Sequence, residues 1–304
     1  MSSDSKLMSL TEAIAKWVPH GCSVAMGTCL EAMIPFAAAH EMIRQQKRDL
    51  TLVGPISDIC FDQLIGAGCV ARVRAAWVGN VITGSAYNFR RAVEAGTLAV
   101  EDHSNFTLST ALRAGASGVP FMPVRTALGS DLFKTNPSLS TVKCPFTGVT
   151  LAAVAAITPD VSIIHVQRAD TAGNAHMWGS MGVTREACLA SDAVILTSET
   201  IVDTEVITSD PNRVFTPGFR VSAVVHVPWG GHPSPVPGFY NRDHQAFLDY
   251  RTASTTPELF AQWRREWVDD VAGRQSYLER LGDRRLAHLQ LQHHLLSEPV
   301  DYGY

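Results

Sequence analysis

The sequence lacks any apolar run close to the ~20 residues that a membrane-spanning helix requires. Its first residues, MSSDSKLMSLTEAIAKW, also lack the basic region and apolar stretch of a secretory signal peptide. Charge is sparse and nearly balanced, since 18% of the residues are charged and the net charge is −4. This balance gives no reason to expect nucleic acid or an anionic membrane as a partner. We therefore expect a cytoplasmic globular protein that binds neither.

The six cysteines include no Cys-x-x-Cys pair, and most stand in apolar surroundings. We expect buried, reduced thiols, and Cys29 is the one that we expect in a loop after a strand. A metal site is not expected, because His226, His232 and His244 are scattered around a proline-rich loop without ligand spacing. No strand–GxGxxG–helix segment is present either. The sequence therefore predicts no permanently bound cofactor.

What the chain does contain is an alternation of short apolar strands and amphipathic helices through its first half. Such alternation favours βαβ units and an open, mostly parallel α/β sheet flanked by helices. Residues 133–150, rich in Pro, Thr and Ser, are expected to form a lid or excursion. Residues 257–296 are expected to form a C-terminal helical extension that opens with a proline. No linker is evident, so we predict one domain over residues 1–304.

The most informative stretch covers residues 98–132. An apolar strand leads into Glu101, a helix follows after a capping Ser-Asn pair, and residues 119–124 have the pattern of the next strand. In open α/β sheets, ligands bind at the carboxyl ends of the strands. We therefore expect Glu101 and the loop over residues 125–130 to lie on the same edge of the sheet.

Glu101 is the strongest candidate for a catalytic or substrate-positioning residue. A carboxylate between a buried strand and a helix start is subject to burial, which raises its pKa, and to the helix N-terminus, which stabilises the anion. Such a group could act as a base, or could position a substrate hydroxyl or a side chain of a partner. The alternative is an acid at a helix start that only satisfies backbone amides.

Two further polar groups have simpler interpretations. Asp170 and Asn174 flank a glycine after a buried strand, which favours a turn whose side chains bond their own backbone. His165 is expected to be a hydrogen-bonded histidine of the core or the sheet edge rather than a base. Ser198 and Glu199 belong to a Ser-Glu-Thr triplet, which is not the motif of a nucleophilic serine.

Several segments resemble the α (A) subunit of family I CoA-transferases of the glutaconate CoA-transferase type. They are LTEAIAKWV, RDLTLVGP, LIGAGCV, FRRAVEAG with VEDHSN, GVPFMPVRTALGS, IIHVQRADTAGNAHMWG and HPSPVPGFY. The resemblance extends from about residue 10 to beyond residue 285. One departure concerns the loop after the first strand, which reads Gly27-Thr28-Cys29 where the family commonly has paired glycines. The lost glycine restricts close backbone approach to a ligand there.

The resemblance implies a heteromer with a β subunit, either a heterodimer or α2β2, and an active site at the junction. The implied reaction moves CoA from an acyl-CoA, glutaconyl-like or another short or dicarboxylic acyl, to a free carboxylate. A glutamate of the β subunit would attack the thioester and carry a glutamyl-CoA thioester, so CoA enters as substrate. Glu199 is not nominated as this nucleophile. The substrate-binding residues expected in this chain are Thr28, Asn80, Ser85, Arg125, Gly129 and Ser130.

Two other functions compete with transfer. Some relatives of this pair of chains resemble hydrolases that open a cyclic β-keto acyl-CoA in steroid degradation, where Glu101 would serve as the general base. A ligand-sensing protein on a sugar-phosphate-isomerase-like fold is the third possibility. The absence of a basic patch or a helix–turn–helix segment argues against that one. A β chain that carries the nucleophilic glutamate favours transfer, and one without it favours hydrolysis.

Overall fold

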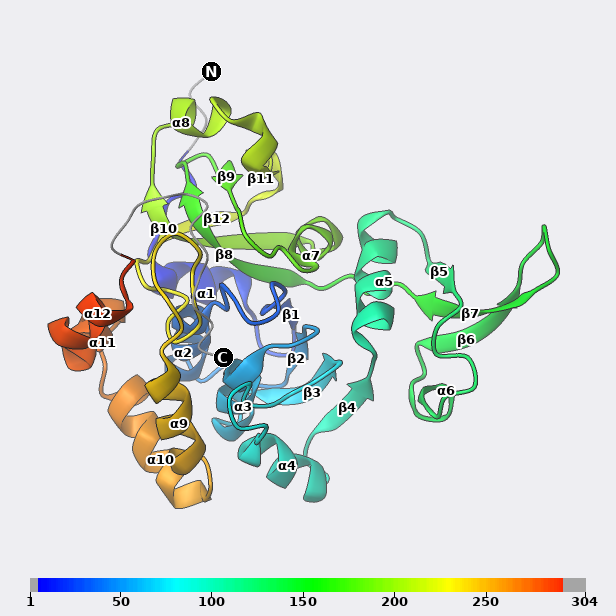
Figure 1. Cartoon of the computed structure of the whole chain (residues 1–304), viewed down its shortest axis with the longest axis horizontal. Helices are drawn as coiled ribbons and strands as arrows, with labels where there is room; N and C mark the ends of the chain where they lie inside the picture. The colour runs from blue at the N-terminus through cyan, green and yellow to red at the C-terminus, as the bar shows by residue number, and fades with distance from the viewer. Residues whose placement is uncertain (1–4, 292–304) are drawn as a thin grey trace.

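Two β-sheets of unequal size organise the chain in a computed structural model, which describes residues 5–291 (Figure 1). The large sheet has nine strands, and its parallel path runs β12-β10-β8-β1-β2-β3-β4. Two short strands, β9 and β11, extend it by antiparallel pairing beside β8. Its strands are β1 (Ser23–Ala25), β2 (Leu50–Val53), β3 (Val70–Ala75), β4 (Ala99–Asp102), β8 (Val161–Ala169), β9 (Ala175–His176), β10 (Ala193–Ile201), β11 (Val214–Thr216) and β12 (Ala223–His226). The expected open, mostly parallel sheet is confirmed.

Helices cover both faces of this sheet, which explains why its central strands are apolar on both sides. One hydrophobic cluster joins α1, α2 and α3 with α9 and α10, and another packs α5 and α7 against the opposite side of β1 and β2. The helices are α1 (Leu10–Trp17), α2 (Phe36–Arg44), α3 (Asp58–Gly66), α4 (Tyr87–Glu94), α5 (Asn105–Ala116), α6 (Leu132–Thr135), α7 (Thr184–Ala190), α8 (Thr204–Thr208), α9 (His244–Ala253), α10 (Pro257–Arg264), α11 (Arg274–Leu281) and α12 (Asp283–Leu289). Short helical turns are η1 (Pro211–Arg213), η2 (Gly218–Arg220) and η3 (Arg265–Asp269).

The second sheet is an arm that projects from the body beyond α5 (Figure 1). We define the arm as residues 121–155, with β5 (Phe121–Val124), α6, β6 (Leu139–Lys143) and β7 (Thr150–Ala155). Its strand order is β5-β7-β6, and both pairings are antiparallel. Residues 133–150, expected to form a lid or excursion, lie within this arm.

The prediction of a strand over residues 119–124 is confirmed for β5, but its expected place beside the parallel strands is wrong. β5 pairs with β7, with Phe121 opposite Ala155, and it forms an edge of the small sheet. The physical reason lies in Pro123, which has no backbone N–H to donate and therefore suits an edge strand.

The C-terminal part is helical from α9 through α12, and residues 292–296 of the predicted extension lie outside the described residues. Thr256 caps α10 by accepting a hydrogen bond from the Leu259 amide, and Pro257 takes the first helical position, where its missing donor is not needed. Within residues 5–291, no helix is long and apolar enough to cross a membrane.

Candidate active site

Among the described residues, four of the seven non-glycine residues with a positive φ lie in loops at the carboxyl edge of the large sheet, and the others are Gln46, Asp49 and Ala127. Leu30 (φ 65°) and Met33 (φ 52°) follow β1, Asp58 (φ 51°) follows β2, and Trp229 (φ 60°) follows β12. A non-glycine residue held in this left-handed region costs about 1–3 kcal/mol and persists only where the surroundings fix it. Such strain collects at binding and catalytic sites. This edge is therefore the candidate active site.

The loop after β1 is fixed through its side chains. The Thr28 hydroxyl lies 2.9 Å from the Thr184 hydroxyl, and the Cys29 thiol lies 3.0 Å from the same group. Burial raises the pKa of the Cys29 thiol to about 12, so this cysteine, which its loop position set apart from the other five, is also an inert thiol. Gly27 has a φ of 66°, and a Cβ there would meet Ser57 Oγ at 2.5 Å, so the loops after β1 and β2 touch.

The loop after β3 is organised by two buried side chains. Asn80 donates to the Phe247 carbonyl at 2.9 Å and accepts from the Ile82 amide at 2.9 Å. Asp58 accepts from the Val81 amide at 3.0 Å, and its burial raises the pKa of its carboxyl to about 7. Ser85, also predicted to bind substrate, is half-buried and bonds to the side chain of Tyr87. Asp58 was missed from the sequence, since nothing local distinguishes it from an ordinary helix-start acid.

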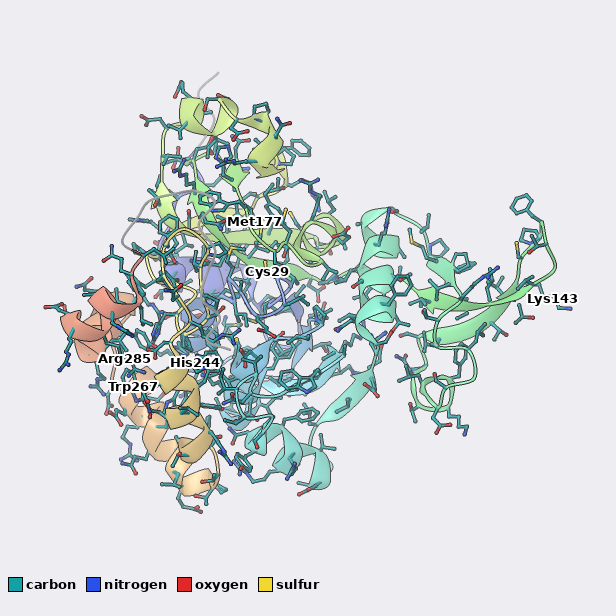
Figure 2. All side chains as sticks on the ribbon, in the orientation of Figure 1. Cys29, Lys143, Met177, His244, Trp267 and Arg285 are labelled. Carbon is teal, nitrogen blue, oxygen red and sulfur yellow. The ribbon has the colours of Figure 1, made fainter. Side chains whose placement is uncertain are left out.

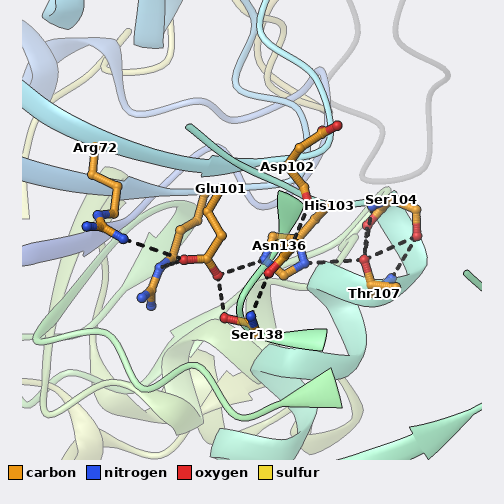
Figure 3. A network of polar contacts seen from close by, with 9 residues as sticks. Arg72, Glu101, Asp102, His103, Ser104, Thr107, Asn136 and Ser138 are labelled. Carbon is orange, nitrogen blue, oxygen red and sulfur yellow. Dashed lines mark hydrogen bonds and ion pairs between the residues drawn. The ribbon is translucent and has the colours of Figure 1, made fainter. Parts of the chain in front are cut away.

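Glu101 is the centre of a polar network at the end of β4 (Figure 3). Its Oε2 accepts from Arg74 Nε at 3.0 Å, and Arg72 Nη1 lies 3.9 Å away. Its Oε1 accepts from Ser138 Oγ at 2.6 Å and lies 3.1 Å from His103 Nε2. Only 3% of the residue is exposed. Glu101 therefore has side-chain partners rather than the backbone amides of the simpler hypothesis.

This network decides the charge of the carboxyl. Burial by itself would raise the pKa of Glu101, but the hydrogen bonds from His103 and Ser138 and the charge of Arg74 outweigh it and lower the pKa to about 2. A carboxylate with so low a pKa is a weak proton acceptor at neutral pH. In this arrangement Glu101 is an anion that joins strands rather than a poised base.

The same network attaches the arm to the body. Ser138 comes from the segment before β6, and Asn136 Nδ2 donates to the Asp102 carbonyl at 2.6 Å. The predicted substrate-binding residues Arg125, Gly129 and Ser130 are exposed on the arm. Within residues 5–291, the partners of Glu101 do not include these three. The arm residues that join this network are Ser138, which bonds to Glu101, and Asn136, which bonds to the neighbouring Asp102 carbonyl, and the sequence carries no signal for either.

A second buried carboxylate, Glu199, stands at the end of β10. It accepts hydrogen bonds from Tyr240 Oη at 2.6 Å and from the Trp229 amide at 2.7 Å, and it lies 2.7 Å from His165 Nε2. The other ring nitrogen of His165 lies 2.9 Å from the Thr197 hydroxyl. His165 is therefore the hydrogen-bonded histidine that we expected.

The proline-rich loop over residues 228–240, which Glu199 bonds at Trp229 and Tyr240, is hydrogen-bonded to the loop after β1 and the start of α2. The Ala37 amide donates to the Gly230 carbonyl at 3.0 Å, and the Met33 amide donates to the Pro235 carbonyl at 2.9 Å. Ser234 Oγ adds a bond to the Glu31 carbonyl at 2.9 Å. The strained Met33 is thus held directly by the proline-rich loop.

The polar turn predicted at Asp170 and Asn174 has the expected form at Asp170. Asp170 Oδ1 accepts from the amides of Ala172 and Asn174 at 3.0 and 2.8 Å, as the turn hypothesis predicts. Asn174 differs, because its Nδ2 donates to Asp170 Oδ2 at 2.7 Å and its Oδ1 accepts from the distant Gly218 amide at 2.8 Å.

A cluster that the sequence analysis missed lies under the C-terminal helices. His232 Nε2 is 2.8 Å from Asp243 Oδ2, its Nδ1 is 2.8 Å from Tyr277 Oη, and Arg285 Nε is 2.6 Å from the same Asp243 oxygen. Burial lowers the pKa of His232 to about 4 despite the hydrogen bond and charge of Asp243, which act in the opposite direction. His232 therefore has side-chain partners of its own and anchors the C-terminal helices to the proline-rich loop.

Comparison with known proteins places this arrangement in a family. The coenzyme A transferase family model matches residues 7–227. The chain is 42% identical over 266 residues to the A chain of the 3-oxoadipate CoA-transferase of Pseudomonas knackmussii, covering 86% of this chain and 93% of that one. The IpdA chain of the cholesterol ring-cleaving hydrolase of Rhodococcus jostii is more distant, at 28% identity over 86% of this chain and 92% of its own length.

Structure gives the same result. The A chain of the glutaconate CoA-transferase of Acidaminococcus fermentans is 34% identical over 94% of this chain and 95% of its own length. The crystal structure of that transferase superposes with a TM-score of 0.91 and covers 94% of this chain and 96% of the solved one. The chain therefore belongs to the coenzyme A transferase family, with the fold of the α subunits of the glutaconate CoA-transferase type.

Proposed function

We propose that this chain is the α subunit of a heteromeric enzyme that moves CoA between an acyl-CoA and a free dicarboxylate. Two relatives that share most of its length are named for 3-oxoadipate and glutaconate, so these acids are the first substrates to test. The β subunit would supply the attacking glutamate, and this chain would supply walls of the acyl site at its carboxyl edge. Coenzyme A thioester enters as substrate, with no permanently bound group.

The main support for this proposal is that the two buried carboxylates at the carboxyl edge, those of Glu101 and Glu199, are both hydrogen-bonded within this chain. Glu101 and Glu199 each have at least three polar partners, and an anion held in this way is a poor nucleophile toward a thioester. This supports a partner chain as the source of the glutamate that attacks acyl-CoA.

In the proposed reaction, a β-subunit glutamate attacks the thioester carbonyl, the C–S bond breaks, and CoA leaves as thiolate. The thiolate then attacks the glutamyl carbonyl of the mixed anhydride, which releases the first carboxylate and leaves a glutamyl-CoA thioester. The acceptor carboxylate repeats these two steps in reverse order and leaves as the new acyl-CoA. No water is consumed, so turnover depends on the acceptor acid.

The proposed substrate-binding residues of this chain fall into two groups. The side chains of Thr28 and Asn80 have partners within the chain, so they would contribute by fixing the shape of their loops. Arg125 and Ser130 are exposed on the arm and would meet substrate where a β subunit closes over it.

The test is to co-express this chain with a β-type subunit of the same organism and incubate the complex with an acyl-CoA, with and without free 3-oxoadipate, glutaconate or acetate. Transfer predicts turnover that requires the acid, together with a glutamyl-CoA thioester on the β chain that hydroxylamine or borohydride traps for mass spectrometry. Turnover without an acceptor and without a trapped thioester would refute it.

The second candidate is hydrolytic ring opening of a cyclic β-keto acyl-CoA. Its support is the similarity to the Rhodococcus hydrolase chain and the place of Glu101 at the end of β4. The lowered pKa of Glu101 favours transfer over this alternative. Acceptor-independent turnover that disappears in Glu101→Ala, with the fold intact, would favour the hydrolase.

A further inference from the structure

The outer face of the arm is apolar although no described element covers it. Directly paired residues in antiparallel strands share one face of a sheet. Cross-strand pairing therefore places on one face the residues Phe121, Pro123, Ser140, Val142, Leu151, Ala153 and Ala155. All of them except Ser140 are apolar, and none is charged.

The opposite face of the arm already has its cover. Val124, Leu139 and Val154 belong to the cluster that packs against Leu108 and Leu112 of α5. An antiparallel sheet with one face on the core normally carries polar residues on the other face. Next to α5 this sheet is apolar on both faces, which is typical of a sheet that is covered on both sides, whereas Thr141, Lys143 and Thr150 lie on the α5-side face toward the end of the arm.

The apolar character continues to the end of the arm, away from the body. Figure 2 places Lys143 near that end, far from Cys29 at the centre of the molecule. Phe146, in the β6–β7 turn just beyond it, is 94% exposed, and Val149 just before β7 is also exposed. A fully exposed phenylalanine beside an uncovered apolar sheet face marks an interaction surface.

We propose that the outer face of the arm and the Phe146 turn form the docking surface for the β subunit. This inference rests on the proposed function, which requires a second chain with the nucleophilic glutamate at the carboxyl edge. A second copy of this chain would not meet this requirement, because its Glu101 and Glu199 would be hydrogen-bonded in the same way.

The root of the arm explains how docking would serve the site. Ser138 and Asn136 join the arm to Glu101 and to the Asp102 carbonyl at the carboxyl end of β4. A partner that binds along the arm is therefore held beside the edge where the strained loops meet. An uncharged apolar face also suits a permanent partner, since obligate interfaces are more hydrophobic than transient ones.

The test uses the full chain co-expressed with its β-type partner, with sedimentation velocity as the readout of complex formation. Val142→Lys and Leu151→Lys each place a charge on the outer face, and Thr141→Lys is the matched control on the opposite face of β6. Phe146→Ser is a milder variant in the turn, and Phe219→Ser removes an 83% exposed phenylalanine remote in sequence from the arm. The thermal unfolding of each free chain shows that it folds.

We expect the two outer-face lysines and Phe146→Ser to weaken the complex at least tenfold, while Thr141→Lys and Phe219→Ser stay within twofold of the unchanged chain. Unchanged affinity in Val142→Lys, Leu151→Lys and Phe146→Ser would overturn the proposal. So would a failure of the unchanged chains to associate, or a homodimer of this chain that Val142→Lys abolishes. If the complex forms and depends on the arm but shows no acceptor-dependent transfer, the docking proposal stands and the proposed function falls.

Discussion

Replacing Glu101 by glutamine removes the charge that joins β3, β4 and the arm. The carboxyl has a pKa of about 2 against an ordinary value near 4.5, a difference of roughly 2.5 units. At 1.36 kcal/mol per unit, discounted for solvent screening, the folded environment favours the anion by about 2 kcal/mol at neutral pH. Glutamine also brings an NH2 group toward donors such as Arg74 or His103, which leaves buried donors without an acceptor.

The pH dependence gives the prediction its sign. Because the folded pKa lies below the unfolded one, the stabilisation from Glu101 is fully present above about pH 5 and is lost as the pH falls from about 4.5 toward 2. We expect Glu101→Gln to lower the free energy of unfolding by about 2 kcal/mol at pH 7 and by clearly less at pH 3. Urea unfolding of both proteins at pH 7, 5 and 3 measures the difference.

A matched control is the ion pair of Asp131 and Lys134, which is 2.5 Å long and exposed on the arm. Surface pairs of this kind contribute about 0–1 kcal/mol, so Asp131→Asn should leave the free energy of unfolding nearly unchanged. If Glu101→Gln were as stable as the unchanged chain at pH 7, or if its deficit were equal at pH 7 and pH 3, the reasoning about this network would be refuted.

Three further predictions concern other buried groups. Glu199→Gln places an NH2 donor next to the donors of Tyr240 and Trp229, so the free energy of unfolding should fall by about 1–3 kcal/mol. Thermal unfolding measures this loss, and an unchanged Tm would contradict the anchoring role of Glu199. The raised pKa of Asp58 means that the stabilisation of its protonated form is present below about pH 4 and is lost as the pH rises through about 7. Asp58→Asn should therefore stabilise the chain relative to wild type at pH 8 and have less effect at pH 4, in denaturation at the two pH values, whereas an equal effect at both would exclude this titration. Iodoacetamide at pH 8 should label Cys144, whose thiol pKa is lowered by its bond to Thr147, well before Cys29, as peptide mass spectrometry would detect.

The sequence predicted the layers of the fold because hydrophobic periodicity determines them. The runs around Val161–Ala169 and Ala193–Ile201 are apolar over the stretches that a doubly covered strand requires, and both became central strands. The cap at Ser104 was also predictable, since its hydroxyl accepts from the Thr107 amide in the expected way.

The position of the arm was not predictable in the same way. β5 has the local pattern of any short strand, and only its pairing with β7, some thirty residues later, removes it from the parallel sheet. Ser138 and Asp58 are similar cases, because their partners Glu101 and Val81 lie 37 and 23 residues away. Single polar residues carry no periodic signal for such long-range contacts.

The hydrogen bonds between the proline-rich loop and the loop after β1 can form only after the proline-rich loop has been synthesised. Ser234 and Glu31, which these bonds join, are separated by 203 positions in the chain. At about 5–20 residues per second, the ribosome needs about 10–40 s to make the segment between them. During that interval the early loop can contact Ser57 and Thr184, but the Met33 amide lacks its acceptor, the Pro235 carbonyl. The carboxyl edge is therefore among the last parts of a newly synthesised chain to reach its final geometry. Truncated chains that end before the proline-rich loop would be unable to complete this edge.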